Sequence, residues 1–202
     1  MKMISLVAAG LLVSSMASVA TAAPTVGQPA PDFRATDVAG KPVSLADFKG
    51  KYVVLEWNNP GCPFVQKHYD SGNMQSLQKR FGAENVAWLS VNSTAQSSSD
   101  YMAPGKLAAW FKQHNAAPTA VLMDTGGDVG RAFGAKVTPH MYVIDANGTL
   151  VYAGAIDDKR STNPADVKTA SNYVAAALTD AKSGKPVSKA SSSAYGCTIK
   201  YN

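Results

Sequence analysis

The residues of this sequence best suited to chemistry surround Cys62, in the stretch Trp57-Asn58-Asn59-Pro60-Gly61-Cys62-Pro63-Phe64-Val65. This stretch follows the strand-forming run 52–55 and precedes a segment with helical spacing, so Cys62 falls where a strand ends and a helix begins. The unpaired N–H groups and the positive dipole at a helix N-terminus favour a thiolate, and Pro63 suits a first turn because it has no N–H to lose. We therefore expect a lowered pKa and a reactive thiol at Cys62. The alternative is a small buried hydrophobe or one end of a structural disulfide.

The first 22 residues predict an export signal. Lys2 is followed by the apolar run 4–13 and by the small residues Ala20-Thr21-Ala22, which is the layout of a cleavable secretory signal with cleavage before Ala23. The apolar run is too short to span a bilayer. We expect a periplasmic or secreted protein that is not membrane-bound after cleavage, and residues 23–202 are enough for one domain.

Net charge gives little support to binding of nucleic acids or lipid surfaces. The formal charge is +5, and no run of basic residues is longer than Lys79-Arg80 or Lys159-Arg160. A basic excess that is small and scattered does not form the patch such partners require. We expect neither class of partner.

Cys62 and Cys197 are the only cysteines, so a single intramolecular pair is possible. Disulfides persist in exported proteins, and this one would join the strand–helix junction to the end of the chain as either a structural staple or a redox pair. The tail 187–202 ends in Tyr195-Gly196-Cys197-Thr198-Ile199-Lys200-Tyr201, a composition that predicts docking. The 13 residues from Gly184 to Cys197 span roughly 40 Å when extended, so reach permits contact with Cys62.

Hydrophobic patterning predicts an α/β fold. We expect two short strands within 31–45 about a turn at 37–40, and further strands at 52–56, 86–91, 119–123, 141–144 and 149–153. We expect helices after Cys62 with an interruption at 71–73, and at 106–114, 128–133 and 163–182, with a surface loop at 92–104. This order implies parallel βαβ units closed by an antiparallel pair, with helices on both faces of a central mixed sheet.

The segment Val137-Thr138-Pro139-His140, a proline just before a strand, resembles the thioredoxin fold, in which a cis-proline packs against the active-site sulfur. Within that fold the chain is similar to the redoxin, or AhpC/TSA-like, family, and most resembles its peroxiredoxin-like branch of exported bacterial thioredoxin-family proteins. The matching stretches are 26–33, 37–41, 48–51, 62–65, 134–140, 152–158 and 196–201. The resemblance implies a thioredoxin-like domain at 23–186, with an N-terminal β-hairpin extension, and an ordered tail at 187–202.

Departures from the family pattern narrow the chemistry. Peroxiredoxins have a threonine or serine where this chain has Asn59, a proline where it has Leu55, and an assisting arginine about where it has Pro139. These departures from the pattern of the family that the chain resembles argue against fast peroxide reduction. Val65 and Gln66 occupy the positions of the second cysteine in dithiol and copper-delivering relatives, so only Cys197 can act as a second thiol.

From these residues we predict a thiol-disulfide oxidoreductase in which Cys62 is the nucleophile and Cys197 the resolving cysteine. The expected substrate-binding residues are Thr138 and Pro139, which would present backbone, together with Trp57 and Pro63. The expected partners are a thiol or disulfide protein substrate or a small-molecule oxidant, and an external thiol reductant, with no cofactor. The alternatives are a slow thiol peroxidase and a non-catalytic module with a structural Cys62–Cys197 disulfide.

A metal site formed by Cys62, His140 and Cys197 is a further alternative, disfavoured because no two ligands are closely spaced. His68 and His114 fall on predicted helices without cysteine or carboxylate at ligand spacing, and we expect both at the surface. Trp57, Trp88 and Trp110 are expected in the core rather than at a recognition surface, although Trp57 is close enough in sequence to line the site.

Overall fold

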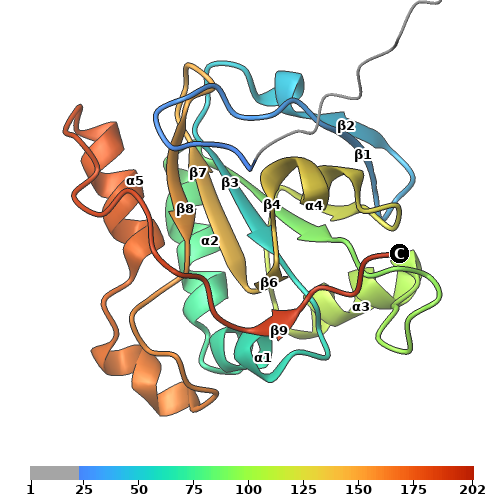
Figure 1. The fold of residues 1–202 in the computed structure, drawn as a ribbon. Coiled ribbons are helices and arrows are strands. Elements are labelled where there is room, and N and C mark those ends of the chain that lie inside the picture. Colours follow the sequence, from blue (N-terminus) through green and yellow to red (C-terminus); the bar gives the residue numbers. More distant parts are fainter. Residues whose placement is uncertain (1–22) are drawn as a thin grey trace, which may run out of the picture.

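Strand β3 (Val53–Trp57) lies in the interior of a seven-stranded sheet in the computed structural model, which describes residues 23–202 (Figure 1). All five of its residues are buried, as expected of an apolar strand covered on both faces. It pairs in parallel with β4 (Ala87–Asn92) and antiparallel with β7 (His140–Ile144). The predicted signal segment 1–22 lies outside the described residues, so its cleavage stays a prediction.

The order of strands across the sheet is β2-β1-β5-β4-β3-β7-β8. Its remaining members are β1 (Arg34–Asp37), β2 (Pro42–Ser44), β5 (Ala120–Met123) and β8 (Leu150–Gly154). Strands β3, β4 and β5 are parallel, whereas β7 and β8 form an antiparallel hairpin, and the N-terminal hairpin β1–β2 extends the sheet through β5. The predicted α/β class with a mixed sheet is confirmed.

Helices cover both faces of the sheet (Figure 1). On one face, a single core cluster holds side chains of α1 (Pro63–Asp70), α2 (Asn73–Ala83), α3 (Pro104–Gln113) and α5 (Tyr173–Lys182). On the other face, α4 (Asp128–Phe133) packs with the N-terminal hairpin. The steps from β3 to β4 and from β4 to β5 join parallel strands in one direction, so right-handed crossovers place α1, α2 and α3 on the same face. Side chains of α4 belong to the core cluster of the opposite face. The 3-10 helix η1 (Leu45–Phe48) links β2 to β3.

The predicted helix 163–182 is wrong as a single element. It is divided into the 3-10 helix η2 (Pro164–Thr169) and α5, because Ala170 is extended. Asn172 caps α5 by accepting a hydrogen bond from the N–H of Ala175 at 2.8 Å. Asparagine is among the best N-cap residues, so a new helix starts there.

The predicted surface loop 92–104 is wrong for its first four residues, which are buried. Ser93 Oγ accepts a hydrogen bond from Trp57 Nε1 at 3.0 Å and donates one to Asp124 at 2.6 Å. Asn92 Nδ2 donates to the carbonyl of Asn58 at 3.1 Å. Polar side chains are readily buried when their hydrogen bonds are satisfied in this way.

The tail crosses the end of the sheet, as the red segment of Figure 1 shows, and its predicted docking is confirmed. Strand β9 (Cys197–Thr198) pairs antiparallel with β6 (Val137–Thr138) in a separate two-stranded ribbon. Ile199 is buried and its N–H donates to the carbonyl of Lys136 at 3.0 Å. Within residues 23–202, no helix has the length and apolarity that a membrane span requires.

Candidate functional site

Cys62 is the N-cap residue of α1 and lies just beyond the carboxyl end of β3, as predicted. Its N–H donates to the carbonyl of Asn59 at 3.0 Å, and the Asn59 side chain accepts from the N–H of Gly61 at 2.9 Å. The side chain of Gln66 donates to the carbonyl of Pro60 at 2.9 Å. These bonds fix the turn between strand and helix, so the sulfur is held at the helix N-terminus.

Cys62 forms a disulfide with Cys197, 135 residues away in sequence, with Cα atoms 5.8 Å apart. Pairing of β6 with β9 places Cys197 directly opposite Thr138. The Sγ of Cys62 lies 3.1 Å from the carbonyl oxygen of Thr138, and the Thr138–Pro139 peptide bond is cis. Four residues singled out from the sequence are therefore brought together from three distant segments.

Gly196 makes this approach of the tail possible. Its φ is +143°, and a Cβ atom there would collide with the Thr138 carbonyl. Glycine is the residue that accepts both the backbone conformation and the close contact. The tail thus depends on Gly196 to bring Cys197 to Cys62.

We expect Gly196→Ala to lower the equilibrium constant for closing the disulfide by about tenfold or more, because strain of this kind costs about 1–3 kcal/mol. The measurement is the oxidised fraction in glutathione buffers, determined by alkylation. Gly184→Ala is the matched control, because Gly184 has φ +70° with open space around it. Equal equilibrium constants for the two variants would contradict this role of Gly196.

The other predicted substrate-binding residues differ in accessibility. Pro63 is exposed at the first position of α1, whereas Pro139 is buried. Trp57 is fully buried, as expected of a core residue, and this burial contradicts its other predicted role in contacting substrate. Its ring packs against Phe133 and Tyr142, at centroid distances of 5.6 and 5.2 Å, on the face of β3 that carries α4.

Glu56, which the sequence analysis did not single out, is a fully buried carboxyl six residues before Cys62. It accepts hydrogen bonds from four side chains, at 2.7 to 3.1 Å: Asn58, Tyr69, Trp88 and Ser90. Burial raises the pKa of Glu56 against the opposing effect of these donors. A single acid in an otherwise apolar strand was the signal available in the sequence, and perturbed groups of this kind gather at functional sites.

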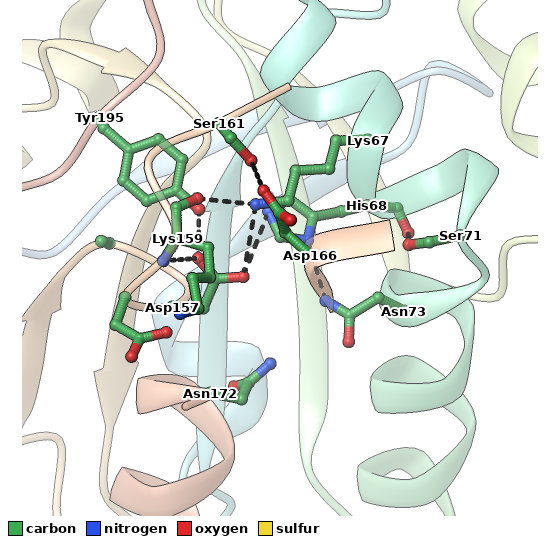
Figure 2. Close-up of polar contacts among 12 residues, drawn as sticks. Lys67, His68, Ser71, Asn73, Asp157, Lys159, Ser161, Asp166, Asn172 and Tyr195 are labelled. Carbon is green, nitrogen blue, oxygen red and sulfur yellow. Dashed lines mark hydrogen bonds and ion pairs between the residues drawn. The ribbon is translucent and has the colours of Figure 1, made fainter. Parts of the chain in front are cut away.

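A second buried polar group, the Asp157 cluster, consists of Lys67, His68, Asp157 and Tyr195 (Figure 2). One carboxylate oxygen of Asp157 accepts a hydrogen bond from the Tyr195 hydroxyl, and the other lies 3.8 Å from Lys67 Nζ and 3.9 Å from His68 Nε2. Lys67 Nζ also donates to the carbonyl of Lys159 at 2.7 Å. The cluster therefore joins α1 to the tail two residues before Cys197.

The prediction that His68 is a surface residue is wrong, since it is fully buried in this cluster, while His114 is half-buried. The Nδ1 of His68 lies 2.9 Å from the side-chain nitrogen of Asn73, which makes Nδ1 the acceptor. Burial, and secondarily the charge of Lys67, lower the pKa of His68 to about 3. The Asp157 carboxylate opposes this effect, but at 3.9 Å without a hydrogen bond it does not outweigh burial.

We expect His68 to make the unfolding free energy depend on pH. Its pKa is about 3 in the folded chain and about 6.5 when unfolded, so the unfolded state binds more protons between these values and stability falls as pH drops from 6.5 toward 3. Between pH 6.5 and 4.5 the loss relative to His68→Gln should reach about 2–3 kcal/mol. Urea unfolding of both proteins across this range measures it, and parallel pH profiles would refute it.

No cluster of three or more His, Cys, Asp or Glu side chains suited to a metal occurs in the described part of the chain. The predicted alternative of a metal site used Cys62 and Cys197 as ligands. Their sulfurs are joined in the disulfide, so neither is a thiolate ligand. His140 is half-buried with Nδ1 3.2 Å from the Tyr142 hydroxyl, and burial lowers its pKa to about 4.

Comparison with known proteins agrees with this geometry. The model of the AhpC/TSA family matches residues 26–153. Thiol-disulfide oxidoreductase ResA of Bacillus thuringiensis subsp. konkukian is 29% identical over 127 residues, which are 62% of this chain and 67% of ResA. An uncharacterized conserved protein from Geobacillus kaustophilus has a similar structure, with a TM-score of 0.75 and 26% identity, covering 88% of this chain and 93% of that one.

A thiol:disulfide interchange protein from Bacteroides sp. shares the fold at a TM-score of 0.52 and 20% identity, covering 72% of this chain and 88% of that one. The fold is thus thioredoxin-like, and the named relatives together with the Cys62–Cys197 disulfide support a redox function. Because the matched segment runs from the N-terminal hairpin through the cysteine turn to β8, the chain belongs to the AhpC/TSA family.

Proposed function

We propose that this protein is an exported thiol-disulfide oxidoreductase whose redox pair is Cys62 and Cys197, with Cys62 as the nucleophilic thiolate and Cys197 as its resolving partner. The observation that carries the proposal is the disulfide itself, at the N-terminus of α1 and against the Thr138 carbonyl. A helix N-terminus stabilises the thiolate that forms when such a bond opens. Its partners would be a protein thiol or disulfide or a small oxidant, and an external thiol reductant.

Disulfide exchange is preferred to peroxide reduction because the peroxidase groups are replaced. Asn59 stands where peroxiredoxins have a threonine or serine, and its side-chain oxygen is already bonded to the N–H of Gly61. Pro139 supplies no charge where peroxiredoxins have an arginine. Exchange between sulfurs requires only a thiolate and an accessible disulfide sulfur.

A non-catalytic module with a permanent disulfide is the second candidate. The burial of Cys62, which is 1% exposed, favours it, because a buried bond resists reduction. The two functions differ in reduction potential. A structural bond is expected below about −300 mV and is not reduced by glutathione, whereas an exchanging bond has a less negative potential.

The test equilibrates the purified protein with glutathione and dithiothreitol buffers and maps both cysteines by alkylation. The proposal expects reduction at a potential above about −300 mV, and catalysis of disulfide exchange in a model protein that Cys62→Ser and Cys197→Ser each abolish. A bond that opens only below that potential, or wild-type exchange no faster than that of the variants, would support the permanent tie instead. One equivalent of peroxide, added to the reduced protein, measures the peroxidase alternative separately.

A further inference from the structure

The two sulfurs of the redox pair differ in their access to solvent. Cys62 is 1% exposed and belongs to the core cluster that holds side chains of α1, α2, α3 and α5, whereas Cys197 is only half-buried. An incoming thiolate must reach the sulfur that it attacks. Cys62 lies beneath the tail that carries Cys197, as the pairing of β9 with β6 requires.

Opening the disulfide would leave the tail held at many other points. Before Cys197, the Tyr195 hydroxyl donates to Asp157, and its ring packs edge-on against Phe64 of α1 at 5.8 Å. After Cys197, Ile199 is buried and the Tyr201 hydroxyl donates to the carbonyl of Ala135 at 2.9 Å. Docking on both sides of Cys197 keeps its sulfur near Cys62 without the covalent bond.

The Asp157 cluster is the one of these attachments in which the tail bonds to a buried carboxylate. Lys67 and His68 belong to the helix that begins at Cys62, and both side chains are fully buried beside Asp157 (Figure 2). Tyr195 closes the cluster from the tail, with the Lys67 ammonium 5.7 Å from its ring centre. A hydrogen bond to a buried carboxylate is stronger than one between neutral groups.

We infer that partners exchange with the sulfur of Cys197, while Cys62 acts only within the molecule and Tyr195 positions Cys197 for it. This inference rests on the proposed redox pair but reverses the roles proposed above: Cys197 is the sulfur that exchanges with partners, and Cys62 is the one that resolves the mixed disulfide. The tail is then a resident part of the site, and Cys62 is shielded from substrates in both redox states.

Each step balances with an external thiol as co-reactant. The partner thiolate attacks Cys197 Sγ, a partner–Cys197 disulfide forms, and the Cys62–Cys197 bond breaks with its electron pair leaving on Cys62. A thiol of lower pKa leaves faster, which suits a sulfur at a helix N-terminus. A second partner thiolate then attacks the partner sulfur, releases Cys197, and two protons convert the pair to thiols. Two partner thiols are thereby oxidised to a disulfide. In the reverse direction, the Cys197 thiolate attacks a partner disulfide and releases one partner thiolate, and the Cys62 thiolate then attacks Cys197 Sγ and expels the second.

The first test identifies the sulfur that is attacked. Oxidised protein is mixed with excess reduced glutathione, quenched with acid at short times and digested with trypsin, which separates peptide 52–67 with Cys62 from peptide 190–200 with Cys197. We expect at least about tenfold more glutathione on 190–200. Equal or reversed labelling overturns the inference and leaves the proposed redox function intact. Absence of label on both peptides overturns the proposed function and the inference with it.

The second test measures shielding after the bond is removed. We expect Cys62 in Cys197→Ser to react with iodoacetamide at least about tenfold more slowly per thiolate than Cys197 in Cys62→Ser. Adding Tyr195→Phe to Cys197→Ser should raise the Cys62 rate severalfold, because the tail loses its bond to Asp157. Tyr201→Phe is the matched control, since it removes one tail hydroxyl that bonds only a neutral carbonyl. Equal rates in the two phenylalanine variants would overturn the positioning role of Tyr195.

Discussion

Reduction of the Cys62–Cys197 disulfide is expected to lower the unfolding free energy by about 5 kcal/mol, the value of the chain-entropy model for a loop of this length. The two cysteines are 135 residues apart, so the bond restricts most of the unfolded chain. The folded state changes little by comparison, because the tail is attached by β9, Tyr195 and Ile199 as well.

Urea unfolding of the wild-type protein, oxidised and reduced, measures this difference. The double variant Cys62→Ala, Cys197→Ala is the control, because its stability should be close to that of reduced wild type and independent of reductant. A difference below about 1 kcal/mol between the two wild-type forms would mean that the loop is not restricted in the unfolded state.

Asp157→Asn is expected to destabilise the protein by about 3–5 kcal/mol, because it leaves the buried Lys67 ammonium without its carboxylate. Asparagine preserves the size of the side chain and can still accept from Tyr195, so the loss reports mainly the charge. Thermal or urea unfolding with the disulfide reduced separates this effect from the covalent tie.

Two further variants make the charge argument testable. Asp158→Asn alters the adjacent carboxylate, which is exposed and accepts from the N–H of Ser171, and should change stability by less than about 1 kcal/mol. Lys67→Met combined with Asp157→Asn removes both charges and should recover most of the loss. A double variant no more stable than Asp157→Asn alone would contradict this explanation.

The tail is thus attached to the domain in two independent ways. The disulfide acts on the unfolded chain, and the Asp157 cluster acts on the folded one. The losses of unfolding free energy caused by reduction and by Asp157→Asn should therefore be nearly additive. If the proposed redox function holds, the Asp157 cluster is what would keep Cys197 beside Cys62 when the disulfide opens.

Local sequence signals predicted much of the framework. The apolar run before Cys62, the turn at 37–40 and the hairpin 141–153 each have the periodicity and turn residues of the element that forms. The helix 163–182 was misjudged because apolar spacing continued through Asn172, whose capping bond starts a new helix. Capping is a local choice that hydrophobic spacing alone does not reveal.

The sequence by itself determined that Cys62 sits at a helix N-terminus and that Cys197 is the only possible partner. Tertiary structure alone decided that the two are bonded, that Cys62 is buried while Cys197 is half-buried, and that Lys67, His68 and Tyr195 surround Asp157. Burial and long-range pairing depend on how distant segments cross the end of the sheet. Lys67 and His68 of α1 have residue types typical of a protein surface, and only the packing of Asp157 against them in the folded chain shows that they are buried.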